Sequence, residues 1–185
     1  GELSKICRAV PESHTDEMRR SRLSCARISR TRLEPSTIPG AGRGLFATRD
    51  IAEDELITLY PGDVVLCWPD ADHAESPTVL LGAGTKSSFA SDPFDFTCDA
   101  WLYGVHTTAT RAICGDPAQD GDPAYFGHFA NDAARCDRAG TAGEIYASES
   151  ELRANAALDS WSMGDCHLAL VACKAIVANE EIFMS

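Results

Sequence analysis

From residue 38 onward, apolar residues occur in short runs that glycine, proline and aspartate interrupt. Runs of this length are typical of strands, and the residues between them are typical of turns. The segments predicted to be strands are 45–47, 55–60, 64–68, 101–106 and 167–176, with a further short strand near the C-terminal end. The sequence therefore indicates a mainly β fold with short helices.

Charge and composition divide the chain into a short flank and one domain. Residues 1–33 carry eight Lys/Arg and four Asp/Glu, whereas residues 34–185 carry eight and twenty-four. Apolar residues at helical spacing in 13–32 predict that the flank is helical. Residues 34–185 have the length of one ordinary domain, and within it 69–100 is rich in Ala, Asp, Ser and Gly. We interpret 69–100 as an insertion.

The acidic body restricts the class of partner. A negative surface attracts basic peptides such as histone tails and repels nucleic acid, although ordinary solubility explains the same charge equally well. No apolar run approaches the roughly 20 residues needed to span a bilayer, and no secretory signal is visible, so no membrane role is predicted. The sequence predicts no particular oligomeric state.

Cysteine and histidine spacing argues against a metal site. The eight cysteines include no CxxC pair, and the five histidines form no HxxxH or HExxH pattern. Scattered cysteines of this kind are typical of small core residues in a reducing compartment. We predict no metal ligands and an intracellular protein, in the nucleus or the cytoplasm.

Alternate glycines stand at Gly40, Gly42 and Gly44, just before an apolar strand. Glycine tolerates unusual dihedrals and close approach by another group, because it has no Cβ. A Rossmann nucleotide site would need a strand before the glycines and a helix after them, and this stretch has neither. A structural turn and a turn that holds a ligand against the main chain both remain open.

A polar pair, Asn131-Asp132, follows an aromatic-rich loop at 124–126. Burial would oblige these side chains to find hydrogen-bond partners. The asparagine amide both donates and accepts, which suits the mixed edge of adenine. A turn that selects Asn and Asp for their dihedrals is the alternative.

Three stretches together resemble the SET-domain protein-lysine methyltransferase family. Residues 40–62 resemble its opening GxGxGLFAxxxIxxxxxI followed by Tyr-x-Gly, with Tyr60 at the tyrosine. Residues 127–132 resemble (R/G)HxxNHS, with Asn131 at the asparagine and Asp132 in place of the second histidine. Residues 167–185 resemble the closing strand and xAxxxIxxxEEL. The resemblance spans 38–185 and implies a β-clip fold of several small sheets with knot-like C-terminal threading.

By this resemblance the protein is expected to move a methyl group from S-adenosyl-L-methionine to a lysine of a histone or other basic protein. The implied cofactor-binding residues are Ala41, Gly42, Arg43, Gly44, Asn131 and Asp132. The implied catalytic residues are Tyr60 and Tyr103, each of which also fits an ordinary core role. The family places a further tyrosine just after Ser185, so the resemblance implies either a truncated C-terminal end or a protein that lacks this tyrosine. A SET-like module that binds peptide without catalysis is the alternative.

Overall fold

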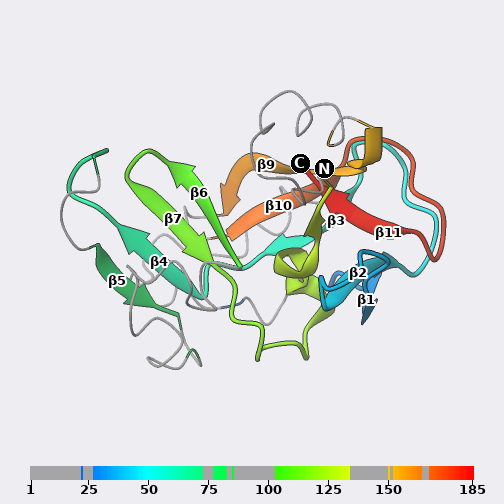
Figure 1. Ribbon diagram of the computed structural model, residues 1–185, viewed down its shortest axis with the longest axis horizontal. Helices are drawn as coiled ribbons and strands as arrows, with labels where there is room; N and C mark the ends of the chain where they lie inside the picture. The colour runs from blue at the N-terminus through cyan, green and yellow to red at the C-terminus, as the bar shows by residue number, and fades with distance from the viewer. Residues whose placement is uncertain are drawn as a thin grey trace.

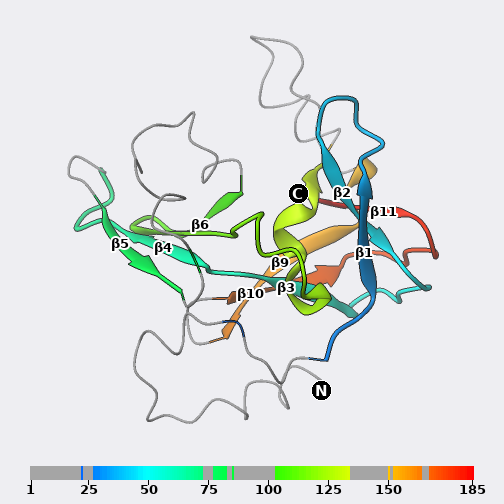
Figure 2. The ribbon, with the colours of Figure 1, turned by 90° about the horizontal axis from the view of Figure 1, so that it is seen from below.

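The computed structural model describes residues 22, 27–72, 77–82, 85, 103–133, 150, 152–163 and 167–185. These residues form two β-sheets and two single-turn 3-10 helices, η2 (Pro123–Tyr125) and η3 (Gly127–Phe129). The smaller sheet extends to one side of the molecule and the strands β1, β2 and β11 lie at the other, with the 3-10 turns between them (Figures 1 and 2). No helix in the described part of the chain is long and apolar enough to cross a bilayer.

The larger sheet contains seven strands, and all three motif stretches contribute strands to it. Six lie in a path, in this order: β1 (Thr31–Pro35), β2 (Arg43–Ala47), β11 (Glu181–Met184), β9 (Ala156–Met163), β10 (His167–Ala172) and β3 (Leu56–Tyr60). The seventh, β8 (Asn131–Asp132), pairs with β11. Every side chain of β3 (LITLY) is buried, as expected of a strand covered on both faces. Its one aliphatic hydroxyl, that of Thr58, donates to the Pro123 carbonyl at 2.9 Å.

The smaller sheet has four antiparallel strands. Their order is β5 (Thr78–Leu81), β4 (Val64–Cys67), β7 (Arg111–Cys114) and β6 (Gly104–Thr108). Alternate residues of β4 face opposite sides: Val64 and Leu66 belong to one apolar cluster, and Val65 belongs to another that includes Tyr60 and Leu168. This second cluster joins the two sheets.

The C-terminal strand β11 is enclosed between distant parts of the chain. It pairs antiparallel with β2 and parallel with β8 and β9. Asn155, which is 1% exposed, fastens it: the side chain accepts from the Phe183 amide at 2.9 Å and donates to the Glu181 carbonyl at 2.9 Å. The mainly β class is confirmed, and the position of β11 agrees with the expected C-terminal threading.

Several strands differ from the sequence prediction. The strand expected at 101–106 is found at 104–108, and the one expected at 167–176 ends at 172. Five strands were not predicted, namely β1, β5, β7, β8 and β9. Within the insertion, β5 is a strand, and most of the remaining insertion lies outside the described residues.

The N-terminal flank departs from the expected helix wherever it is described. Residues 27–30 have no regular structure, and β1 then pairs residue for residue with β2 across the boundary expected after Leu33. Ile28 is buried in a core cluster, and Arg22 forms a bidentate ion pair with Asp63. These residues belong to the body because burial and strand pairing stabilise them there. The remainder of the predicted helix lies outside the described residues.

Candidate functional site

The glycine-rich segment is the loop of the β1–β2 hairpin. The Ser36 amide donates to the Gly42 carbonyl at 2.9 Å, and the Ala41 amide donates to the Ile38 carbonyl at 3.1 Å. Gly40 and Gly42 have φ angles of 83° and 72°, in the left-handed region that favours glycine. A Cβ at either position would meet no atom within 4 Å. The loop therefore exposes main chain with open space beside it.

Gly44 is glycine for a different reason. A Cβ there would overlap the Glu181 carboxylate and lie 3.2 Å from the Ser36 Cα. The carboxylate is fixed by the Ser36 hydroxyl at 2.6 Å, the Thr37 amide at 2.7 Å and the Thr37 hydroxyl. Glu181 is only 5% exposed. These contacts hold the hairpin loop against β11.

We expect Gly44→Ala to lower the free energy of unfolding by about 1–3 kcal/mol, the usual effect of overpacking a fixed environment. The methyl group would displace a carboxylate that several donors hold in place. Urea unfolding measures the change. Gly121→Ala is the matched control, because a Cβ at Gly121 meets nothing within 4 Å and its stability should change little. Equal effects of the two substitutions would contradict this packing role of Gly44.

Asn131 lies where the glycine-rich stretch 40–62 and the stretch 127–132 meet. Its side-chain amide donates to the Arg43 carbonyl at 3.2 Å and to Glu181 Oε1 at 3.4 Å. In β8 it stands opposite Phe183 of the enclosed strand. The hairpin loop, β8 and β11 thus converge around one amide, although 88 residues separate Asn131 from Arg43 in sequence.

Arg43 points along the surface beside the hairpin loop and already has an anionic partner. Its guanidinium lies 2.7 Å from Asp120 Oδ2, donates to the Pro117 carbonyl at 3.0 Å and stacks over the Phe129 ring at 4.4 Å. The hydrogen bond from Arg43 lowers the pKa of Asp120. A ligand carboxylate that used Arg43 would have to compete with Asp120.

Asp132 is exposed at the end of β8, opposite Met184. Its position next to Asn131 places it at the rim of the site. An ionised carboxylate accepts hydrogen bonds only, so Asp132 cannot provide the donor that a histidine would provide there.

Tyr60 and Tyr103 lie together around a buried histidine. The Tyr60 hydroxyl donates to the Tyr103 carbonyl at 2.7 Å, and burial raises the pKa of Tyr60 far above its ordinary value. Both rings meet the His128 ring edge-on, at centroid distances of 6.3 Å and 6.0 Å. As found, Tyr60 is 1% exposed, so its hydroxyl lies within the core rather than at an open surface.

His128 is the unusual member of this aromatic group. The His128 side chain is 4% exposed, and neither of its ring nitrogens has a hydrogen-bond partner of good geometry among the described residues. The nearby backbone of Tyr125 raises the pKa of the imidazole slightly. Burial, with a smaller contribution from Arg22, lowers its pKa to about 3. The imidazole is therefore neutral at physiological pH.

Glycines also allow this group to pack closely. A Cβ at Gly127 would lie 2.9 Å from the Tyr60 Cα and 2.8 Å from the Leu59 carbonyl oxygen. A Cβ at Gly115 would lie 2.6 Å from the His128 Cβ. The second motif therefore packs directly against the end of β3, which carries Tyr60.

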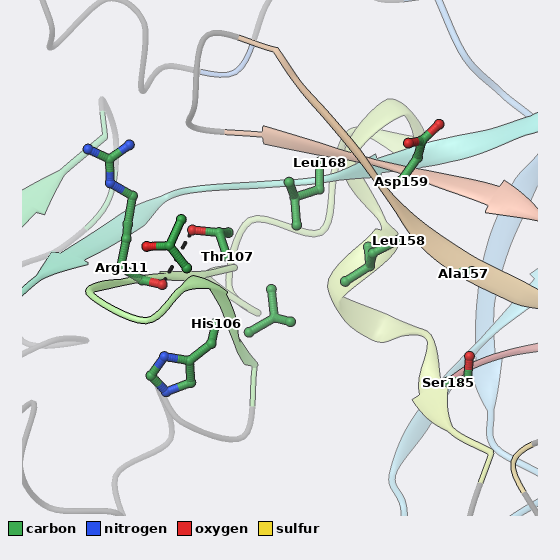
Figure 3. Close-up of a pocket in the computed structure, with 10 residues that line it drawn as sticks. His106, Thr107, Arg111, Ala157, Leu158, Asp159, Leu168 and Ser185 are labelled. Carbon is green, nitrogen blue, oxygen red and sulfur yellow. Dashed lines mark hydrogen bonds between the residues drawn. The ribbon is translucent and has the colours of Figure 1, made fainter. Parts of the chain in front are cut away.

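A half-open cavity of about 490 Å³ lies between β6 and the β9–β10 pair (Figure 3). Leu168, in its wall, stands opposite Tyr60 in the β10–β3 register. Ser185 also lines the cavity, directly after β11. The glycine loop is not part of its lining, so the described structure offers two distinct sites joined by the enclosed strand and the aromatic group.

The structure brings Arg43, Gly44 and Asn131 into one contact group and places Tyr60 with Tyr103 in another. Sequence reasoning missed Asp120, His128 and the role of Glu181. The closing motif contains Glu181, but its contact with the hairpin loop spans 145 residues and leaves no local signal. Asp120 stands in a loop whose composition indicates only a turn.

This is a mainly β domain in which a glycine hairpin, an asparagine-bearing loop and an enclosed C-terminal strand meet. The family model of the SET domain matches residues 42–185, most of the chain, and the protein therefore belongs to the SET-domain family. Members of that family are generally protein-lysine methyltransferases.

Comparison with curated proteins gives no match. Among solved structures, the chain is similar to a Plasmodium falciparum protein described as a candidate histone methyltransferase. The two are 12% identical, the match covers 84% of this chain and 91% of that chain, and the TM-score is 0.43. The family assignment rests on the family match alone.

Proposed function

We propose that the protein transfers a methyl group from S-adenosyl-L-methionine to a lysine side chain of a basic protein. The observation that carries the proposal is the contact of Asn131 with the Arg43 carbonyl, which joins two motifs of the family beside an open glycine loop. Fold alone does not define an activity, whereas the residues at this site can bind a specific ligand.

The hairpin loop fits a ligand that approaches main chain. Gly40 and Gly42 leave free the volume that a side chain would fill, and their φ angles turn the backbone sharply. The residues that would hold the cofactor are Ala41, Gly42, Arg43, Gly44, Asn131 and Asp132. When bound, S-adenosyl-L-methionine would supply an electrophilic methyl group: a neutral amine attacks the methyl carbon, and the thioether leaves with the electron pair of the broken C–S bond.

The protein's own part is to position and desolvate the amine. An ammonium that enters a poorly hydrated cavity loses its proton more easily, because burial disfavours the charged form. Leu168 lines the cavity of about 490 Å³ and also belongs to the apolar cluster around Tyr60. The lysine side chain would enter through this cavity toward that cluster. Tyr60 and Tyr103 would orient the amine at the end of that route only after the Tyr60 hydroxyl leaves the Tyr103 carbonyl, to which it donates as found. Alignment of donor and acceptor is the main source of rate in such displacements.

A binding module without catalysis is the second candidate. Arg43 is occupied by Asp120 at 2.7 Å, and Asp132 replaces the histidine of the family motif. Both features reduce the number of donors that remain for the carboxylate of the cofactor. Under this alternative the cavity would still hold a peptide, and no methyl transfer would follow.

Titration calorimetry with S-adenosyl-L-methionine separates the two candidates. We expect binding by the parent protein and roughly tenfold weaker binding by Asn131→Ala, because one lost hydrogen-bonding side chain at a partly buried site is worth about 1–1.5 kcal/mol. Asn179→Gly is the control, since glycine readily adopts the φ of 70° found there. Absence of binding by the parent would exclude the enzyme hypothesis. With binding established, transfer of labelled methyl groups to basic peptides tests the reaction.

Asp120→Asn should strengthen cofactor binding about two- to fivefold, because it removes a carboxylate that competes for Arg43. Both side chains are substantially exposed, at 42% and 49%, so the effect is modest. Asp122→Asn makes the same charge change in the same loop. Its side chain caps η2 through the Ala124 amide, a role that asparagine also fills. Equal changes in the two variants would show that net charge, not release of Arg43, governs binding.

A further inference from the structure

The segment 116–120 forms a tight turn that contacts the glycine hairpin through Arg43. The Gln119 amide donates to the Asp116 carbonyl at 2.9 Å, and the Ala118 amide donates to Asp116 Oδ1 at 2.9 Å. An aspartate side chain that accepts an amide two residues further on stabilises such a turn. Asp116 is 5% exposed, so the turn is anchored in the body of the protein.

An arginine of the N-terminal flank holds this turn in place. Arg22 donates to the Gln119 carbonyl at 2.6 Å, and the same guanidinium donates to both carboxylate oxygens of Asp63. Asp63 in turn accepts from the Asp116 amide at 2.7 Å. The Arg22 and Asp63 side chains are 11% and 2% exposed, so solvent screens their attraction little. One arginine therefore fixes the turn at two places, directly and through Asp63.

The same turn occupies Arg43. The Arg43 guanidinium lies 2.7 Å from Asp120 Oδ2 and donates to the Pro117 carbonyl at 3.0 Å. Asp120 directly follows Gln119, whose carbonyl Arg22 holds. The Arg43 and Asp120 side chains are 42% and 49% exposed, and an ion pair of this exposure forms at a cost in conformational entropy. That cost is smaller where the backbone already holds one partner in position.

We propose that Arg22 is a positioning residue that controls, through the turn 116–120, whether Arg43 is free to bind the carboxylate of the cofactor. While Arg22 holds the turn, Asp120 stays at a high effective concentration beside Arg43 and competes with a carboxylate ligand. When Arg22 leaves the turn, Asp120 gains conformational freedom and releases Arg43 more often. The identity of the ligand rests on the proposed function, whereas the chain of contacts from Arg22 to Arg43 does not. The N-terminal flank thereby acts as an inhibitory latch on the cofactor site.

Arg22→Lys tests this chain of contacts without cofactor. A lysine keeps a positive charge beside Asp63, but it lacks the planar fork that reaches Asp63 and the Gln119 carbonyl together. NMR titration of the aspartate carboxyl groups measures the pKa of Asp120, which the hydrogen bond from Arg43 lowers in the parent. We expect the pKa of Asp120 to rise in Arg22→Lys, toward its value in Arg43→Met, where the partner is removed. An unchanged pKa in Arg22→Lys would overturn the proposal.

Arg30→Lys is the matched control for Arg22→Lys. It makes the same change in the same flank at a side chain of similar exposure, 13% for Arg30 and 11% for Arg22. Arg30 also contacts a carboxylate and a main-chain carbonyl, those of Glu55 and Leu56. The pKa of Asp120 should stay at the parental value in Arg30→Lys. Equal shifts in the two lysine variants would show a general effect of the flank and contradict the latch.

Thr85→Val loosens the turn without altering the buried ion pair. It removes the hydroxyl that accepts from the Gln119 side-chain amide at 3.1 Å. The pKa of Asp120 should shift in the same direction as in Arg22→Lys, and this variant keeps the test decisive if Arg22→Lys does not fold. No shift in any folded variant that frees the turn would overturn the proposal.

Titration calorimetry with S-adenosyl-L-methionine tests the consequence at the site. Arg22→Lys should bind the cofactor about twofold more tightly than the parent, because Asp120 then competes less for Arg43. The gain should be absent in the Asp120→Asn background, where the latch has no carboxylate to present. Unchanged affinity in Arg22→Lys, or an equal gain with and without Asp120, would contradict a route through this residue.

The carboxyl titration and the cofactor titration fail separately. If the pKa of Asp120 rises in Arg22→Lys but the parent binds no S-adenosyl-L-methionine, the latch on Arg43 stands and the proposed function fails. If the parent binds the cofactor while Arg22→Lys changes neither the pKa of Asp120 nor the affinity, the proposed function stands and the latch fails.

Discussion

Asp63→Asn is expected to lower the free energy of unfolding by about 3 kcal/mol, because it leaves a buried cation without its counter-charge. Asp63 is 2% exposed in its side chain and Arg22 is 11% exposed. The arginine donates to both carboxylate oxygens, at 2.9 Å and 2.7 Å, and the Asp116 amide donates to the same carboxylate at 2.7 Å. An asparagine can accept only part of this set and carries no charge.

The same substitution should loosen the loop that carries Asp120. Arg22 also donates to the Gln119 carbonyl at 2.6 Å, and Asp63 holds the loop through the Asp116 amide. Hydrogen exchange of the loop amides in 116–122 should therefore accelerate in Asp63→Asn even under conditions that favour folding.

Glu34→Gln is the control for Asp63→Asn. It also neutralises a carboxylate paired with an arginine, Arg32 at 2.7 Å, but these side chains are 46% and 33% exposed. A pair of this exposure contributes little to stability, because solvent screens the two charges. Chemical denaturation at pH 7 gives both values. A loss in Asp63→Asn no larger than that in Glu34→Gln would contradict the structural role assigned to the buried pair.

The sequence predicted those strands and turns that depend on residues close together in the chain. The apolar runs of β3 and β4 identified strands because burial on both faces demands such runs. The glycine loop was also visible. Left-handed dihedrals are found at Gly40 and Gly42, and at Gly44 the Glu181 side chain approaches the main chain closely. A ligand held by this loop stays a prediction.

Features that depend on partners distant in sequence were not predictable. The sequence placed a domain boundary between residues 33 and 34, yet pairing with β2 makes residues 31–35 one strand, β1. Arg22 reads as one of several basic residues in a flank, and only the fold brings it to Asp63, 41 residues away. Asp120 reaches Arg43 across 77 residues for the same reason. Tertiary contacts, not local preference, decide these positions.

The buried His128 imidazole predicts a loss of stability in mild acid. Its pKa of about 3 lies below the ordinary value of 6.5, so the unfolded chain takes up a proton first as the pH falls. The stabilisation is complete above pH 6.5 and is lost progressively as the pH falls toward 3. Between pH 7 and pH 5 the free energy of unfolding should fall by about 2 kcal/mol from this group alone.

His128→Phe should remove that part of the pH dependence. At pH 7 its stability should stay within about 1 kcal/mol of the parent, because the ring it replaces has no well-formed hydrogen bond among the described residues to lose. The control is His106→Phe, an exposed position where an aromatic ring can still stack on Trp68. Urea unfolding at several pH values compares the three proteins. A parental pH dependence in His128→Phe would assign the effect to other groups.

The two predictions are coupled through Asp63. The negative charge of Asp63 favours the protonated imidazole of His128, whereas Arg22 opposes it. Asp63→Asn removes the favourable charge and leaves the unfavourable one, so the pKa of His128 should fall further. The variant is therefore expected to lose at least as much stability as the parent between pH 7 and pH 5, starting from a lower value at pH 7. Combining it with His128→Phe should abolish this additional loss and leave the deficit from the broken ion pair.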